Sequence, residues 1–79
     1  MTRDEVIARL RAHLGDLVGD AADDLGIDQD IRDELDIDSM DFLQVVRAVH
    51  ADLGVEIPEV DYRLLPTLDA FATYVLERL

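Results

Sequence analysis

The chain has 79 residues, no cysteine, and 19 acidic residues against 7 basic ones, which gives a formal net charge of -12. This length predicts one small domain over residues 1–79, with little room for a catalytic cleft beside its core. The lack of cysteine excludes disulfides, cysteine-ligated zinc and a thiol nucleophile. The negative charge disfavours nucleic acid and anionic membranes as partners and favours proteins that carry a basic patch.

The first element that we expect is a helix over residues 3–17. Thr2 and Glu5 form the T-x-x-E pattern of a capping box, and apolar residues then recur at helical spacing: Val6, Leu10, Leu14 and Leu17. The start, "MTRDEVIARL", is charged and amphipathic, without the apolar block of a signal peptide. No apolar run approaches the roughly 20 residues that span a bilayer. We therefore expect a cytoplasmic protein.

Residues 18–38 lose this periodicity and predict a long first loop that is rich in acids. Eleven of the acidic residues lie between Asp16 and Asp41, where Arg32 is the only basic residue. Isolated apolar residues are expected to anchor this loop to the core: Leu25, Ile31 and Leu35. A loop of this length in a small domain is usually functional or disordered, and regular anchors favour a function.

The next helix is expected over residues 39–53, with Gly54 as its C-terminal stop. At about 100° per residue, one face of it is apolar and is expected to be buried: Phe42, Val45, Val46, Val49 and Leu53. A second face is expected to point to solvent: Met40, Leu43, Gln44, Arg47 and Ala51. Met40 and Leu43 are therefore expected to be exposed apolar side chains.

The last third of the chain predicts one short helical turn and one full helix. Pro58 holds Ile57 extended, and "DYRLL" is expected to form the short turn. Thr67 is expected to cap a helix whose apolar residues recur at helical spacing: Leu68, Phe71, Ala72, Val75 and Leu79. Three main helices, one short helix and a long first loop predict an all-α fold, a small four-helix bundle.

The sequence contains no recognisable catalytic or metal-binding constellation. Ser39 would need a histidine as base, but neither His13 nor His50 can be placed beside it, and both are expected to be solvated surface side chains. An EF-hand loop starting at Asp28 would break at three positions: Arg32, Asp33 and Ser39. We therefore expect no enzyme activity, and we interpret Ser39 as the acceptor of chemistry done by another protein.

The position of Ser39 allows two compatible roles. A serine that opens a helix after a loop is expected to be exposed. The free N–H groups and the positive dipole end of the helix favour a phosphate on its oxygen. An ordinary N-cap is the alternative role.

The stretch "DELDIDSMDFLQVV", followed by "DLGVEIPE", resembles the acyl carrier protein family. The signature of that family is an acidic residue and leucine, then D-S-L or D-S-M, then an apolar helix closed by an "IP" turn. The resemblance covers nearly the whole chain and implies a right-handed four-helix bundle. It also implies 4′-phosphopantetheine joined to Ser39 through a phosphodiester, with a thiol that carries acyl groups as thioesters. Asp38 matches the aspartate before the serine and would help to present it to a phosphopantetheinyl transferase.

Two departures from this family bear on its partners. Family members usually have glycine where this chain has Asp36, and glutamates crowd their second helix for docking to basic enzyme surfaces. Here Gln44, Arg47 and His50 occupy much of that surface, which leaves three acids: Asp38, Asp41 and Asp52. We therefore expect a specialised lipid or polyketide pathway, with acyl-loading, condensing or acyl-transfer enzymes as partners of a monomeric carrier.

The residues expected to contact partners lie beside the serine: Met40, Asp41, Leu43 and Arg47. Met40 and Leu43 are expected to be apolar anchors, and Arg47 is expected to select against enzyme surfaces built for more acidic carriers. Two alternatives remain open: a peptidyl or aminoacyl carrier, and an unmodified acidic helical adaptor in which Ser39 is only a cap.

Phe42 is expected to affect the cargo. In the family, carriers of long chains shelter the acyl tail between the helices, and a phenyl ring one turn after Ser39 would fill volume near the entrance. Opening a close-packed core to admit a tail would lose contacts. We therefore expect short, polar or amino-acid cargo, or cargo held outside the bundle. The alternative is that Phe42 is a core residue with no effect on cargo.

Overall fold

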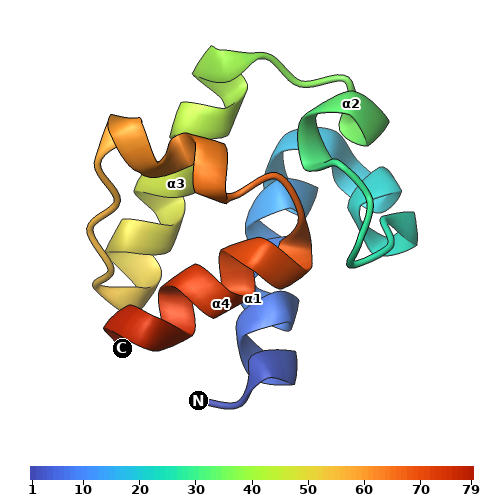
Figure 1. Ribbon diagram of the computed structural model, residues 1–79. Helices are drawn as coiled ribbons and strands as arrows, with labels where there is room; N and C mark the ends of the chain where they lie inside the picture. The colour runs from blue at the N-terminus through green and yellow to red at the C-terminus, as the bar shows by residue number, and fades with distance from the viewer.

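The computed structural model describes all 79 residues and contains helices without any strand. There are four α-helices and two 3-10 helices: α1 (Arg3–Val18), η1 (Gly19–Asp24), α2 (Ile31–Leu35), α3 (Ser39–Leu53), η2 (Glu59–Leu64) and α4 (Leu68–Arg78). Figure 1 shows α3 on one side of the bundle, α2 and η1 on the other, and α1 between them behind α4. The all-α fold expected from the sequence is confirmed.

The first helix, α1, begins at the expected capping box and forms the centre of the bundle. The backbone N–H of Thr2 donates to Glu5 Oε1 (2.9 Å), and the N–H of Glu5 donates to Thr2 Oγ1 (3.2 Å). The bond from the Thr2 backbone holds the pKa of the Glu5 carboxyl below its ordinary value. From there α1 packs against η1, α3 and α4 through its buried residues: Val6, Ile7, Leu10 and Leu14.

The segment expected as a long loop contains two short helices, η1 and α2, so that expectation was wrong in part. Elements of five or six residues span fewer than two turns of an α-helix, too little for an apolar periodicity to show. The expected anchors are confirmed, because Leu25 and Ile31 are buried and Leu35 packs half-buried against the core. Arg11 also holds η1 in place, since its Nη1 donates to the carbonyl oxygens of Ala22 (2.8 Å) and Leu25 (2.6 Å).

The same segment is joined to the start of α4 by backbone hydrogen bonds. Ile31 N–H donates to the carbonyl of Pro66 (2.8 Å), and Asp69 N–H donates to the carbonyl of Ile27 (3.0 Å). The second bond gives a partner to one of the N–H groups that the first turn of a helix leaves free. The acidic segment is therefore fixed to the fold on both sides of the turn between Ile27 and Ile31.

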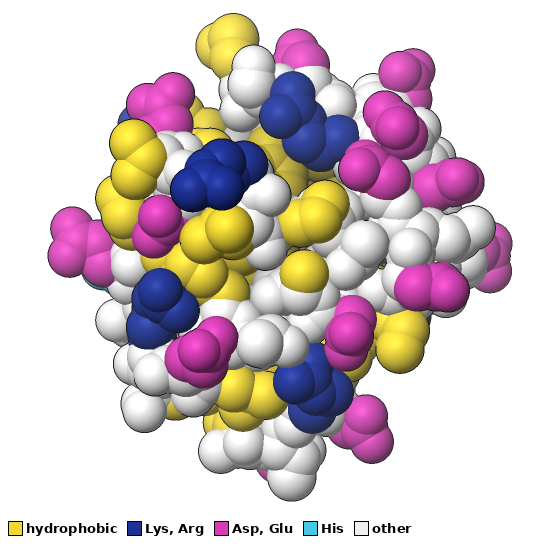
Figure 2. Space-filling view, viewed as in Figure 1, with side chains coloured by type: hydrophobic (Ala, Val, Ile, Leu, Met, Phe, Trp, Pro, Cys, Tyr) yellow, Lys and Arg dark blue, Asp and Glu magenta, His cyan; other side chains and the backbone are white.

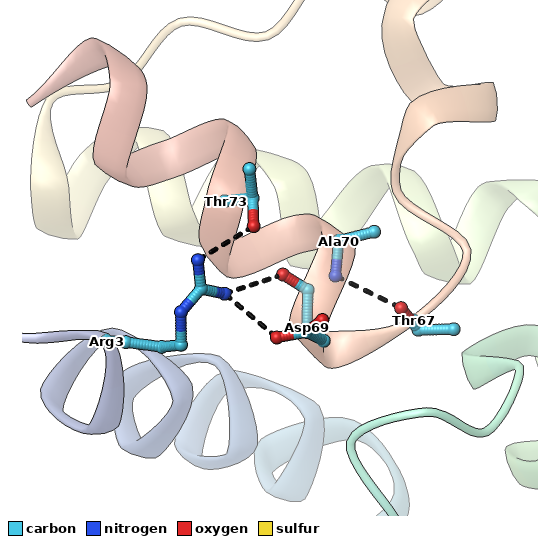
Figure 3. A network of polar contacts seen from close by, with 5 residues as sticks. All are labelled: Arg3, Thr67, Asp69, Ala70 and Thr73. Carbon is cyan, nitrogen blue, oxygen red and sulfur yellow. Dashed lines mark hydrogen bonds and ion pairs between the residues drawn. The ribbon is translucent and has the colours of Figure 1, made fainter.

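The start of α4 is also fixed to the start of α1, as Figure 3 shows. Arg3 Nη1 donates to the carbonyl (3.1 Å) and to the carboxylate (2.9 Å) of Asp69, and Arg3 Nη2 donates to Thr73 Oγ1 (2.9 Å). Thr67 is the N-cap of α4, as expected, because its Oγ1 accepts from the N–H of Ala70 (3.1 Å).

The core is formed by the apolar faces predicted for α3 and α4, with two differences in α4. The last residue, Leu79, was expected on the apolar face but is 54% exposed, because α4 ends at Arg78. Tyr74 is buried instead, and its hydroxyl donates to Asp61 Oδ2 (2.6 Å). Burial, together with this hydrogen bond, raises the pKa of the Tyr74 phenol.

His13 is not the solvated surface histidine that we expected. Its side chain is only 18% exposed, and its Nε2 lies 2.9 Å from Asp52 Oδ2, while Arg9 Nη1 donates to the other oxygen of Asp52. Arg9 first, and His13 second, hold the pKa of Asp52 below its ordinary value. This cluster joins α1 to the C-terminal turn of α3. His50 is exposed, as expected.

The two ends of α3 face opposite ends of the molecule. Figure 1 shows α3 beginning at the upper end of the view, whereas both chain termini lie at the lower end. No helix in the structure combines the length and the apolar character needed to cross a membrane.

Candidate functional site

The N-terminus of α3 is capped by Asp38 and not by Ser39. Asp38 has the extended backbone of an N-cap (φ -93°, ψ -176°), and its Oδ1 accepts from the N–H of Asp41 (2.9 Å). In return, Asp41 Oδ2 accepts a longer bond from the N–H of Asp38 (3.4 Å). The two aspartates therefore form a capping box, and the alternative role of Ser39 as an N-cap is wrong.

Ser39 is the first residue of α3, and its side chain is exposed. None of the side-chain hydrogen bonds in the structure involves its hydroxyl, because Asp38 already caps the helix. His50 lies three turns further along α3, roughly 16 Å away at 1.5 Å per residue. His13 is bound to Asp52, near that same far end of α3. Ser39 thus has no nearby histidine to activate it, which suits a hydroxyl modified by another protein.

A tight turn before α3 sets the position of Ser39. α2 ends at Leu35, and its C-cap Asp36 has a left-handed backbone (φ 52°, ψ 47°) and is the only non-glycine residue with positive φ. The N–H groups of Asp36 and Ile37 both donate to the carbonyl of Arg32, the latter at 3.1 Å. Ile37 is buried, so the turn is held against the core. Glycine adopts this backbone more readily than aspartate does.

The exposed face of α3 carries the side chains expected to meet partners. Met40 is 74% exposed, which confirms the prediction that its side chain points to solvent. Leu43 and Asp41 are half-buried, so Leu43 offers only part of its side chain. Arg47 is exposed, and no ion pair or side-chain hydrogen bond in the structure includes it. At about 100° per residue, Met40, Leu43 and Arg47 lie on one side of α3, next to Ser39, whereas Asp41 lies on another side.

The interior beneath Ser39 is filled by aromatic rings. Phe42 is 2% exposed, and its ring centroid lies 5.7 Å from that of Tyr62, edge to face, and 6.1 Å from that of Phe71. The guanidinium carbon of Arg32 lies 6.0 Å from the Phe42 centroid. The surface depressions, of about 430 Å³ at most, lie elsewhere, and Phe42 lines none of them.

Charge is distributed unevenly around this site. Figure 2 shows acidic side chains gathered over α2 and η1, on the right of the view. Basic side chains lie toward the left and centre of the view, among hydrophobic and some acidic ones. A partner that approaches the start of α3 therefore meets a strongly acidic surface on one side and a mixed surface on the other.

Residues 8–75 match the family described as the phosphopantetheine attachment site. The chain belongs to this family. It is also 23% identical to an acyl carrier protein of Rubrobacter xylanophilus over 98% of this chain and 95% of that protein. Over 95% of this chain and 89% of the relative, it is 25% identical to an acyl carrier protein of Acidothermus cellulolyticus.

Membership in the phosphopantetheine attachment family confirms three expectations from the sequence. These are the resemblance to acyl carrier proteins, a carrier role in place of catalysis, and 4′-phosphopantetheine as the covalent cofactor. The residues present fit that group. Ser39 offers an exposed hydroxyl with no other partner, and Asp38 holds the helix terminus without using it.

Proposed function

We propose that this carrier holds 4′-phosphopantetheine on Ser39 and transports acyl groups between enzymes. The observation that carries the proposal is the free hydroxyl of Ser39 at the exposed first position of α3. When bound, the cofactor supplies a thiol that holds an acyl group as a thioester. The match to the phosphopantetheine attachment family, and relatives named acyl carrier proteins, support this function.

The residues around Ser39 have separate roles in this proposal. Asp38 and Asp41 fix the first turn of α3, so that Ser39 is presented in one orientation to a phosphopantetheinyl transferase. The side chain of each aspartate accepts a hydrogen bond from the backbone N–H of the other. The N–H of Phe42 donates to the carbonyl of Asp38 (3.0 Å). The N–H groups of Ser39 and Met40 are left free, and such groups favour a phosphate at a helix start.

Partner enzymes are proposed to dock on the exposed face of α3. Met40 and Leu43 supply apolar contacts beside the arm, and Asp38 and Asp41 supply the negative charge that basic docking surfaces bind. Arg47 places a positive charge on the same face, which disfavours enzymes that bind more acidic carriers. An Arg47→Glu variant should change which enzymes accept the loaded carrier and leave its thermal midpoint within about 3 °C.

The cargo is proposed to be an acyl group of a specialised lipid or polyketide pathway. The aromatic packing around Phe42 supports a short or polar cargo, or one that stays outside the bundle. An amino-acid cargo is the second candidate, favoured by the same packing. A monomeric state and a cytoplasmic location stay predictions from the sequence.

The attachment can be tested directly, because Ser39 is the only serine in the chain. Purified protein incubated with coenzyme A and a phosphopantetheinyl transferase should gain one arm, and peptide mass mapping should place it on Ser39. Ser39→Ala should gain none, while its stability stays within about 0.5 kcal/mol because Asp38 is the cap. Thr73→Ala, which removes another exposed hydroxyl, is the matched control. An arm on Ser39→Ala would overturn the assignment, and no arm on the unmodified sequence would favour an acidic adaptor.

A further inference from the structure

Arg32 is an arginine without a polar partner in the most acidic part of the chain. Four arginines donate side-chain hydrogen bonds: Arg3, Arg9, Arg11 and Arg78. Arg32 donates none, although Asp33 and Glu34 follow it in α2. Its guanidinium lies over the Phe42 ring, in a cation–π contact at 6.0 Å. The contact holds the guanidinium of Arg32 on the side of α2 that faces α3.

This contact places the guanidinium near Ser39. Phe42 follows Ser39 by three residues in α3, and residues three apart in a helix are neighbours on its surface, with about 5–6 Å between their Cβ atoms. The backbone agrees, because the carbonyl of Arg32 accepts from Ile37 N–H (3.1 Å), two residues before Ser39. The unpaired cation and the serine therefore lie at the same end of α3.

The chemistry of the site gives this cation a partner. A phosphodiester on Ser39 would add a negative charge among three carboxylates: Asp36, Asp38 and Asp41. Arg32 is the only basic residue between positions 16 and 41. A guanidinium stacked on a ring keeps the N–H donors at its edge free, and their planar fork matches phosphate oxygens two at a time.

We propose that Arg32 is a positioning residue that binds the phosphodiester of the arm on Ser39. The proposal rests on the proposed function of Ser39 and adds the direction in which the arm leaves this residue. The first part of the arm is held on the α2 side of α3, over Phe42. The face with Met40 and Arg47 then stays free for partner enzymes.

The test compares the protein with and without the arm in three variants: Arg32→Gln, Arg32→Lys and Arg63→Gln. Arg63 is the matched control, because it is also exposed and without a hydrogen bond but lies in η2. Two quantities are measured on each form. They are the ³¹P resonance of the phosphodiester, and the difference in thermal midpoint between the forms with and without the arm, at low and at high salt.

We expect the arm to raise the midpoint of the unmodified sequence by about 2–4 °C more than that of Arg32→Gln at low salt. This excess should vanish at high salt, since exposed charge pairs are screened. The ³¹P resonance should move in Arg32→Gln, move less in Arg32→Lys, which keeps the charge and loses the fork, and stay in place in Arg63→Gln. The proposal would be overturned if mass spectrometry finds the arm on Ser39 of Arg32→Gln, its ³¹P resonance is unchanged, and the arm raises its midpoint as much as that of the unmodified sequence. Absence of the arm from Ser39 would instead refute the proposed function, and the role of Arg32 with it.

Discussion

Replacing Phe42 should weaken the fold and, at the same time, open space for an acyl tail. Its ring is 2% exposed and contacts both Tyr62 and Phe71. Phe→Ala changes in cores cost about 3–5 kcal/mol, whereas a domain of this length has a total of about 4–12 kcal/mol at the usual stability per residue. Phe42→Leu conserves more volume and should cost about 1 kcal/mol, which lowers the thermal midpoint by about 4–8 °C.

The assay loads the unmodified sequence and both Phe42 variants with acetyl or octanoyl arms and records thermal midpoints. A sheltered tail binds only the folded state, so it should raise the midpoint. Each buried methylene should add up to about 0.8 kcal/mol to the free energy of unfolding. In the unmodified sequence a tail would have to displace the ring, so the two loaded forms should agree within about 2 °C. The volume vacated in Phe42→Ala should shelter methylenes worth about 2 kcal/mol, which raises the octanoyl midpoint by about 10 °C.

A control and a contrary result complete this test. Leu10→Ala removes a buried side chain from α1 at a similar loss of stability, and it should not make the midpoint depend on chain length. If octanoyl stabilises the unmodified sequence as strongly as it stabilises Phe42→Ala, long tails enter the bundle with the ring in place. Phe42 would then be a core residue without influence on cargo.

Three further changes test the surroundings of the site. Asp38→Ala removes the cap of α3 and should lower the free energy of unfolding in urea by about 1 kcal/mol; a loss no larger than that of Ser39→Ala would contradict the assignment of the cap. Asp36→Gly should raise the same free energy by about 0.5–1 kcal/mol, since glycine suits the left-handed backbone, and an unchanged or lower value would show that this residue is not strained. Asp52→Asn should lower the thermal midpoint at neutral pH. Because the folded pKa of Asp52 is lowered from 3.8, its contribution is present above that value and is lost as the pH falls through the folded pKa. The curves for Asp52→Asn and the unmodified sequence should therefore converge in acid, and a constant gap down to the lowest pH would refute the ion pair.

The long helices could be predicted from the sequence because apolar spacing sets which face is buried. The expected range 39–53 is that of α3, and the expected range 3–17 ends one residue before α1 does. Elements as short as α2 leave no such pattern, and their positions depend on tertiary bonds such as those from Arg11 to η1. The anchors Leu25 and Ile31 were still predictable, since leucine and isoleucine are among the residues most often buried, even in an acidic segment.

The site was predictable in composition and less so in geometry. The context singled out Ser39 as a candidate and predicted its exposure, but the alternative role of an N-cap belongs to Asp38. The usual box ends in Glu or Gln three residues after the cap, whereas here Asp41 pairs with Asp38. Long-range contacts were not predictable either. His13 and Asp52 lie 39 residues apart in the chain and meet only because α1 packs against α3.

The placement of the chain termini has a practical consequence for any tethered form of the carrier. Both termini lie at the end of the bundle opposite the start of α3 (Figure 1). An affinity tag, a bead or a neighbouring domain joined at either terminus would therefore be attached at the end of the molecule opposite the start of α3. A carrier immobilised in this way would point its serine outward into solution, where an enzyme in free diffusion could reach it without passing the anchor.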